Sequence, residues 1–357
     1  MIRLAALSRD SKGLPEIALP PSRLALVFGT AAFLAFFCGC SRQGSTPNAG
    51  GTTPRLFKVR VQTDWFAQPE QGGVFQAVAR GFYRESGLEV EILPGGPGRP
   101  VLTGLLAGQS DIELSQSDDV ILRVKAGLPI VIIGAVMEHA PLAVMVHDSS
   151  PVRHFSDLNG GTVVALPGTT WMSFVKAKYH IDFKLIPMNY SIAPFMADKT
   201  LIQQCFVTSE PYFVRQAGGN ARALVIADSG YDPYRVYVTT KRFMAEHPDR
   251  ARAFVAASVR GWDDFMAGNA MPGRLLIQSL NPQMTPAFMD YSIAAIARYH
   301  LVSGYAERGE RTGLLTASRL QEQIDQLVGL NVMAAGLTVG DVASFDFIPS
   351  APGGAAR

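Results

Sequence analysis

The amino-acid sequence predicts an α/β protein with two successive units of strands and helices. From Phe57 onward, short runs with apolar residues at alternate positions are interleaved with segments whose apolar residues recur at helical spacing. The pattern begins again near Ser150, which indicates a second unit of the same class. A chain of 357 residues is long enough for two domains with sizeable cores. Such alternation favours largely parallel sheets covered by helices.

The first unit opens with a strand–helix–strand pattern. Its expected strands are 57–61, 88–92, 112–114, 130–136 and 142–146. Its expected helices are 72–83, 101–107 and one that begins at Ser117, where Asp118 and Asp119 suit the first turn.

The second unit repeats the alternation and is followed by a mostly helical region. Its expected strands are 162–166, 183–186, 203–207 and 224–227. One helix ends at Tyr179, and a second begins at Ser209, a good capping residue followed by Pro211 in the first turn. After a strand at 234–239, the expected helices are 248–267, 273–280, 286–299 and 317–330.

The N-terminal 40 residues have the pattern of an export signal. The apolar run at 24–37 is shorter than the ~20 residues that span a bilayer, and it stops at Cys38-Gly39-Cys40-Ser41. It resembles a bacterial lipoprotein signal, which implies cleavage after Gly39 and lipidation of Cys40. The alternatives are an uncleaved anchor or a buried helix. Residues 41–54 are rich in Ser, Thr, Gly and Pro, as expected of a flexible linker.

The charge, cysteine and histidine content of the chain limits the kinds of partner that it can bind. The formal net charge is +2 and no basic stripe is interleaved with aromatic residues, so we expect no nucleic-acid partner. Behind the leader only Cys205 remains, which excludes a disulfide or a cysteine-based metal site within one mature chain. The spacing of His139, His147 and His154 does not favour a metal site either. We expect no cofactor.

Several short motifs resemble one family of binding proteins. They are DWF at 64–66, EQGGVFQA at 70–77, GFY at 81–83, GLEVEI at 87–92, PGG at 94–96, GQSD at 108–111, GLP at 127–129, DLNG at 157–160, SEPY at 209–212, GYDPY at 230–234 and GW at 261–262. Between about Val59 and Ala267, the chain resembles the solute-binding proteins of ABC importers for thiamine pyrimidine precursors, alkanesulfonates and related compounds. The DWF, SEPY and GYDPY elements favour the thiamine-pyrimidine branch.

The resemblance implies a type II periplasmic-binding-protein fold, with two α/β lobes, two crossovers and a ligand cleft between the lobes. Lobe one is then expected at 55–148 plus 235–350, and lobe two at 149–234. The crossovers are expected where the pattern restarts after the strand at 142–146, and at the strand at 234–239.

Ligands of open α/β sheets bind beyond the carboxyl ends of strands, so residues just after each strand are candidates. By the resemblance, Asp64, Trp65 and Phe66 line the cleft, with an aromatic face for a flat ring and a carboxylate that accepts from an amine. The alternative is a core tryptophan and a helix-capping aspartate. Gln71 and Gly72 begin a helix, where free N–H groups are donors. The alternative there is an ordinary helix start.

Other candidates follow later strands. Ser117 and Asp118 begin a helix, where plain capping is an equal explanation. Thr169, Thr170 and Trp171 occupy a strand-to-helix turn with two hydroxyls and an indole, which favours ligand contact.

The SEPY motif supplies the sharpest candidate, because a Glu210 carboxylate can form paired hydrogen bonds with an aminopyrimidine edge. Its alternative is a negative charge placed favourably at a helix N-terminus. Tyr212 adds an aromatic ring, and Tyr234 either closes over the ligand or belongs to a structural turn. An anionic sulfonate or nitrate would call for Arg or Lys instead. These positions favour a neutral or donor-rich aromatic heterocycle.

We therefore expect a monomeric, exported lipoprotein at the periplasmic or outer face of the cytoplasmic membrane. It would bind a small-molecule ligand and deliver it to the permease and ATPase subunits of an ABC importer, without catalysis. Sulfonate, nitrate or flavin binding is the alternative. A thiamine-pyrimidine synthase is disfavoured, because Gln71 stands where the family's helix-start motif often has histidine, and a cysteine cluster is missing.

Overall fold

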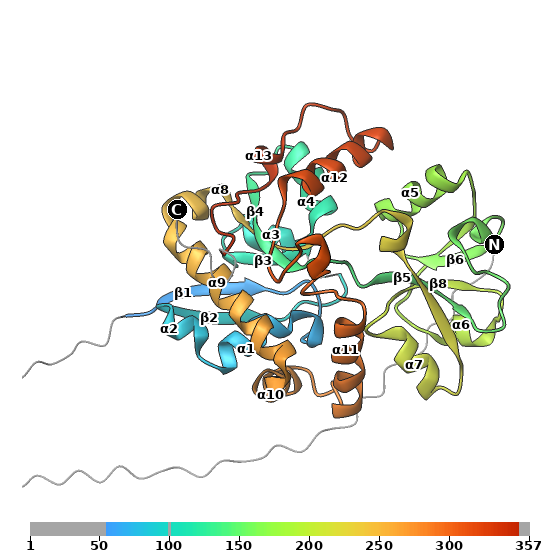
Figure 1. The fold of residues 1–357 in the computed structure, drawn as a ribbon, viewed down its shortest axis with the longest axis horizontal. Helices are drawn as coiled ribbons and strands as arrows, with labels where there is room; N and C mark the ends of the chain where they lie inside the picture. Colours follow the sequence, from blue (N-terminus) through green and yellow to red (C-terminus); the bar gives the residue numbers. More distant parts are fainter. Residues whose placement is uncertain (1–54, 99–100, 350–357) are drawn as a thin grey trace, which may run out of the picture. The chain divides into compact units, whose positions relative to one another are not determined.

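The computed structural model describes residues 55–98 and 101–349. The leader expected at 1–40, including Cys40, and the linker expected at 41–54 lie outside the described residues. In the described ranges the strands form two five-stranded sheets, each flanked by helices (Figure 1). No helix in these ranges combines the length and hydropathy needed to cross a bilayer.

The first sheet contains the strands nearest the two ends of the described chain. Its strands are β1 (Phe57–Gln62), β2 (Leu88–Leu93), β3 (Ile112–Gln116), β4 (Ile130–Met137) and β10 (Arg235–Thr240). Their order is β2-β1-β3-β10-β4. β1 runs parallel to β2 and β3, whereas β10 is antiparallel to both of its neighbours. β4 is buried along its whole length, as its unbroken apolar sequence requires.

The second sheet has the same arrangement. Its strands are β5 (Leu142–His147), β6 (Thr162–Ala165), β7 (Lys184–Pro187), β8 (Ile202–Phe206) and β9 (Ala221–Val225). Their order is β7-β6-β8-β5-β9, with β5 antiparallel to β8 and β9. In each sheet, the strand that is antiparallel to its neighbours is the first one after a crossover: β5 in the second sheet and β10 in the first.

The chain passes between the sheets twice, through residues 138–141 and through 226–234. The first crossover precedes β5, so the expected boundary at Asp148 was wrong. β5 pairs with β8 and β9 and belongs to the second sheet. Its sequence did not reveal this because β4 and β5 are both buried along their whole length and lack an alternating pattern. Hereafter the first lobe is 55–137 with 235–349, and the second lobe is 142–225.

Helices cover both faces of the first sheet (Figure 1). Alternate residues of β10 pack into two different clusters, Tyr237 into one and Val236 and Val238 into the other. The Val236 cluster includes residues of α4 (Ser117–Lys125), α12 (Ala317–Gly329) and α13 (Val339–Val342). The Tyr237 cluster includes residues of α1 (Gly72–Ala79), α2 (Phe82–Glu85) and α9 (Pro248–Asp264).

The remaining helices connect these layers. The first lobe also has α3 (Val101–Leu106), α8 (Lys241–Glu246), α10 (Met271–Leu280) and α11 (Pro286–Arg298). The second lobe has α5 (Thr170–Tyr179), α6 (Ala193–Ala197) and α7 (Glu210–Gln216). Short 3-10 turns lie at Pro69–Gln71, Phe155–Leu158, Ile226–Ser229 and Ala306–Arg308, and a π-turn lies at Phe265–Asn269.

Candidate functional site

A buried carboxyl group joins the two lobes. Glu70, in the turn that precedes α1, accepts a hydrogen bond from the Thr208 hydroxyl of the second lobe at 2.5 Å. Glu70 is 2% exposed, and its Oε2 has no hydrogen-bond partner among the described residues. Burial raises the pKa of Glu70 to about 7; the Thr208 bond opposes this increase and the Glu210 carboxylate reinforces it. Near neutral pH this carboxyl can both donate and accept hydrogen bonds.

A buried arginine lies on the first-lobe side of the same region. Arg235, at the start of β10, donates to Asp64 Oδ2 at 2.5 Å, and Asp64 follows β1. Arg235 is 4% exposed. The positive charge of Arg235 also lowers the pKa of Glu70. The sequence analysis did not identify Arg235.

Aromatic rings from both lobes meet at Trp65. The Trp65 ring centroid lies 5.1 Å from that of Tyr190, which follows β7, and 5.6 Å from that of Phe66. Phe66 is 46% exposed and Tyr190 is 51% exposed, so both rings have free surface for a ligand. The structure thus places Trp65 and Phe66 together with an aromatic residue that the sequence analysis missed.

Glu210 begins α7, and its Oε2 accepts a hydrogen bond from the Phe206 N–H at 2.7 Å. This bond commits one carboxylate oxygen to the loop after β8. Burial raises the pKa of Glu210, and the bond from Phe206 opposes that shift. Glu210 therefore stabilises the loop before α7. This structural role resembles the helix-start alternative and is compatible with ligand binding.

A hydrogen bond joins Asp118 of the first lobe to the second crossover. Asp118 Oδ2 accepts from the Tyr231 hydroxyl at 2.5 Å, and Tyr231 lies in the second crossover. Thr170, at the start of α5, is buried. Burial raises the pKa of Asp118, and the bond from Tyr231 opposes the increase. Thr169 is engaged locally, donating to Leu166 O at 2.9 Å.

Tyr212 packs between the lobes and not against a strand end. Its ring centroid lies 5.1 Å from Phe288 and 5.5 Å from Tyr291, both on α11. Tyr291 also donates to Val207 O at 2.7 Å. These contacts hold α7 of the second lobe against α11 of the first.

Several expected ligand contacts lie in the protein interior. Trp171 is 1% exposed and donates to Gln204 Oε1 at 3.1 Å, inside the core of the second lobe. Tyr234 is also 1% exposed, and the Arg319 guanidinium covers its ring at 3.9 Å. Ser117 is fully buried and bonded to Gln323 of α12 at 2.5 Å. Helix and core packing explains these three positions.

Gly72 and Gln71 serve the start of α1. A Cβ on Gly72 would lie 2.7 Å from the Phe265 ring, so this glycine permits close helix packing, not close approach of a ligand. Gln71 is 1% exposed and its Oε1 accepts from the Gln68 N–H at 3.0 Å. Its Nε2 has no hydrogen-bond partner among the described residues. Only Gln71 of this pair keeps a free donor.

The candidate site is therefore the group Asp64, Trp65, Glu70, Glu210, Arg235 and Tyr190. It contains three carboxyls, one guanidinium and two aromatic rings. In the described ranges, no group of three or more His, Cys, Asp or Glu side chains has the arrangement of a metal site. A cavity of about 370 Å³ in the first lobe includes Asp64 in its lining.

Residues 68–269 match a protein-family model described as NMT1/THI5 like. A putative thiamine biosynthesis protein of Haemophilus influenzae is 26% identical over 145 residues, 38% of this chain and 46% of that protein. Riboflavin-binding protein RibY of Chloroflexus aurantiacus is 24% identical over 238 residues, 62% of this chain and 65% of that protein.

A third relative, the 4-amino-5-hydroxymethyl-2-methylpyrimidine phosphate synthase of Schizosaccharomyces pombe, is 25% identical over 222 residues, 56% of this chain and 63% of that protein. This chain thus spans 46% to 65% of the length of these three relatives.

Two periplasmic binding proteins are among the solved structures that resemble this chain. The periplasmic aliphatic sulphonate binding protein SsuA of Escherichia coli matches with a TM-score of 0.59 and 14% identity, over 80% of this chain and 96% of that chain. The periplasmic nitrate-binding protein NrtA of Synechocystis PCC 6803 matches with a TM-score of 0.60 and 13% identity, over 84% and 92%. These likenesses confirm the expected periplasmic-binding-protein fold.

Proposed function

The chain belongs to the NMT1/THI5-like family, and from this premise we propose that it is the solute-binding component of an ABC importer. Its solute is a thiamine pyrimidine precursor or a similar small aromatic heterocycle. The observation that carries this proposal is Glu70, a buried carboxyl at the junction of the lobes with one oxygen unpaired among the described residues. An aminopyrimidine edge presents a donor and an acceptor side by side, and a carboxyl that titrates near 7 can match both.

The aromatic pair supports a flat solute. Trp65 belongs to the first lobe and Tyr190 to the second, and both rings are partly exposed. Asp64 is the residue directly before Trp65. A flat solute packed against the exposed surface of both rings would bury apolar surface and gain offset stacking. Because the two rings belong to different lobes, such a solute would also favour lobe closure.

The charge distribution argues against an anionic solute. Arg235 is the residue that a sulfonate or nitrate would need, but its guanidinium is already paired with Asp64 at 2.5 Å. An anion would have to displace that carboxylate and also approach Glu70 and Glu210. A neutral, donor-rich heterocycle meets no such repulsion.

A flavin is the second candidate solute. The alignment with the riboflavin-binding protein covers 62% of this chain, against 38% for the relative named for thiamine biosynthesis. A flavin is also flat and carries N–H and carbonyl groups, so the same aromatic pair and carboxyl groups are compatible with it.

Binding without catalysis fits the residues better than synthesis of a pyrimidine. A relative is named a synthase, but Gln71 stands where the family's helix-start motif often has histidine. Its side-chain oxygen is engaged by the Gln68 N–H. The only cysteine in the described ranges, Cys205, is buried.

Export and membrane attachment belong to the same proposal. Lipidation of Cys40 would tether the chain at the periplasmic or outer face of the cytoplasmic membrane, with residues 41–54 as the spacer. A monomer would then deliver its solute to the permease and ATPase subunits of the importer.

Native mass spectrometry of gently purified protein tests the proposal without assuming a solute. We expect a co-purified molecule with the mass of an aminopyrimidine, and denaturation should release it unchanged. Release of an alkanesulfonate would contradict the proposed solute class and move the protein to the sulfonate branch.

A further inference from the structure

A cavity in the first lobe contains a buried acid that the candidate site does not use. The cavity has a volume of about 370 Å³ and is lined by residues of α3, β3 and α4, together with Asp64. We call it the β3–α4 pocket. Its polar lining comes from Asp64, Thr103, Glu113, Ser115, Gln116, Asp119 and Arg123. This volume lies at the small end of the range for small-molecule sites.

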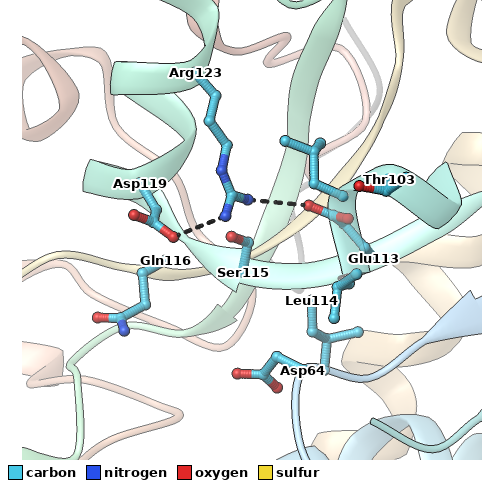
Figure 2. Close-up of a pocket in the computed structure, with 10 residues that line it drawn as sticks. Asp64, Thr103, Glu113, Leu114, Ser115, Gln116, Asp119 and Arg123 are labelled. Carbon is cyan, nitrogen blue, oxygen red and sulfur yellow. Dashed lines mark ion pairs between the residues drawn. The ribbon is translucent and has the colours of Figure 1, made fainter. Parts of the chain in front are cut away.

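Glu113 lies at the wall of this pocket on β3 (Figure 2). Its side chain is 0% exposed, and neither carboxylate oxygen has a hydrogen-bond partner among the described residues. The closest cation, Arg123 Nη1, is 3.6 Å from Glu113 Oε1, which is too long for a hydrogen bond. A buried carboxylate without a donor is costly, so this position gains free energy when a ligand supplies N–H groups.

The rest of the lining is also acidic. The Arg123 guanidinium lies between Asp119 and Glu113, with Nη2 3.1 Å from Asp119 Oδ2 (Figure 2). Asp64 lies across the pocket from this group (Figure 2). Asp64 is already paired with Arg235, so Glu113 and Asp119 are two carboxyl groups that share one guanidinium, that of Arg123. A positively charged group entering beside Glu113 would balance this excess, whereas an anion would increase it.

We propose that the β3–α4 pocket is a subsite for an ammonium-bearing substituent of the bound heterocycle, with Glu113 as the acceptor. The inference rests on the proposed function, because Asp64 lines this pocket and also pairs with Arg235 in the candidate site. The hydroxyls of Ser115 and Thr103 line the same cavity and can accept further N–H groups. Selection among heterocycles would then depend on the substituent as well as on the ring.

Protonation of Glu113 controls this subsite. Burial raises the pKa of Glu113 to about 7, Arg123 opposes the increase, and Asp119 and Asp64 reinforce it. An ammonium group binds the ionised carboxylate, so the preference for an amine should grow as pH rises from 6 to 8. If the protonated carboxyl acted as a hydrogen-bond donor instead, ligand binding would weaken as the pH rises.

Calorimetry with two matched pyrimidines tests the subsite. The probes are 4-amino-5-aminomethyl-2-methylpyrimidine and its 5-hydroxymethyl counterpart, titrated into the full chain at pH 7.5. We expect the parent protein to prefer the amine by about tenfold, the scale of a charge-assisted bond. Glu113→Gln keeps the shape of the side chain and should abolish the preference. The matched control, Glu307→Gln at an exposed position, should retain it.

Equal affinity of the parent for the two pyrimidines, or a preference that survives in folded Glu113→Gln, overturns the subsite. If neither pyrimidine binds, the proposed solute class fails, and benzylammonium against benzyl alcohol then tests the pocket alone. Saturable benzylammonium binding that is lost in Glu113→Gln supports the pocket independently of the solute. Absence of such binding overturns both ideas.

Discussion

The Thr208 hydroxyl of the second lobe donates a hydrogen bond to Glu70 Oε1 of the first lobe at 2.5 Å. Both side chains are buried, and neither belongs to a crossover. The bond can form only when the lobes are close together, so it couples lobe closure to the carboxyl that we place in the ligand site.

Replacing Thr208 with valine should weaken solute binding. The substitution keeps the shape of the side chain but removes the donor, and a net hydrogen bond contributes about 0.5–1.5 kcal/mol, or roughly 2- to 12-fold in affinity. Thr208→Ser keeps the hydroxyl and is the matched control. Calorimetry on both variants measures the effect, and small-angle scattering should show a more open valine variant. Equal affinities of the two variants would contradict the role of this contact.

Replacing Asp64 with asparagine should shift selectivity toward anions. The change removes the carboxylate that pairs with Arg235, so the buried guanidinium becomes available to a sulfonate. We expect measurable binding of an alkanesulfonate by Asp64→Asn, but not by the parent or by Asp325→Asn, an exposed control on α12. Sulfonate binding by the parent that Asp64→Asn leaves unchanged would show that Arg235 does not set selectivity.

Trp65 at the lobe junction and Trp171 in the second-lobe core should respond differently to alanine. Trp65 is only partly buried, so Trp65→Ala should weaken solute binding and change the melting temperature little. Trp171 is 1% exposed in the second-lobe core, and its truncation should destabilise the fold by about 3–5 kcal/mol. Thermal melts and calorimetry on both variants decide this. A stable Trp171→Ala protein that has lost solute binding would return Trp171 to the site.

Protonation of Glu138 should make stability fall as pH rises. Burial raises the pKa of Glu138 to about 9, with Arg319 opposing the increase, and Glu138 is 1% exposed in the first crossover. The folded chain therefore holds a proton that the unfolded chain releases above its ordinary pKa of 4.5. Between those two values the folded state loses up to about 1.4 kcal/mol per pH unit from this group.

Glu138→Gln should remove that contribution, so the variant gains stability over the parent as pH rises from 5 to 9. Glu70 and Glu113 have pKa values raised to about 7 and act in the same direction, so part of the slope below pH 7 should remain. Chemical unfolding across this pH range is the measurement. Glu322→Gln, an exposed change on α12, should leave the curve unchanged. A parallel shift of the whole curve in Glu138→Gln would exclude titration of Glu138 as the cause.

The alternation of strands and helices was sufficient to predict an α/β fold, because the period of apolar residues differs between the two elements. The expectation of largely parallel sheets was wrong, because β10 and β5 each pair antiparallel with both of their neighbours. It did not place β5 correctly. A strand that is buried on both faces has no polar face, and the sequence pattern cannot show which sheet it joins.

The site was predicted only in part, because its geometry depends on contacts between distant segments. Trp65 and Asp64 follow a strand, as the sequence suggested. Arg235 lies within a strand and forms a buried ion pair with Asp64, which is 171 residues away in sequence, and no local pattern predicts such a pair. Tyr190 lies in a polar stretch after β7 that carries no local signal. The sequence around Trp171 is compatible both with a helix start that faces the ligand and with a core position. Only the burial of Trp171 in the structure distinguishes these two interpretations.

Titration of the mature chain with 4-amino-5-hydroxymethyl-2-methylpyrimidine tests the central claim most directly. The same calorimetric series should include riboflavin, an alkanesulfonate and nitrate, with Glu70→Gln as the site variant and Glu307→Gln as its exposed control. We predict one saturable site for the pyrimidine, weakened in Glu70→Gln and unchanged in Glu307→Gln, with no binding of the two anions. Saturable binding of the sulfonate or nitrate by the parent chain, without binding of the pyrimidine, would contradict the account.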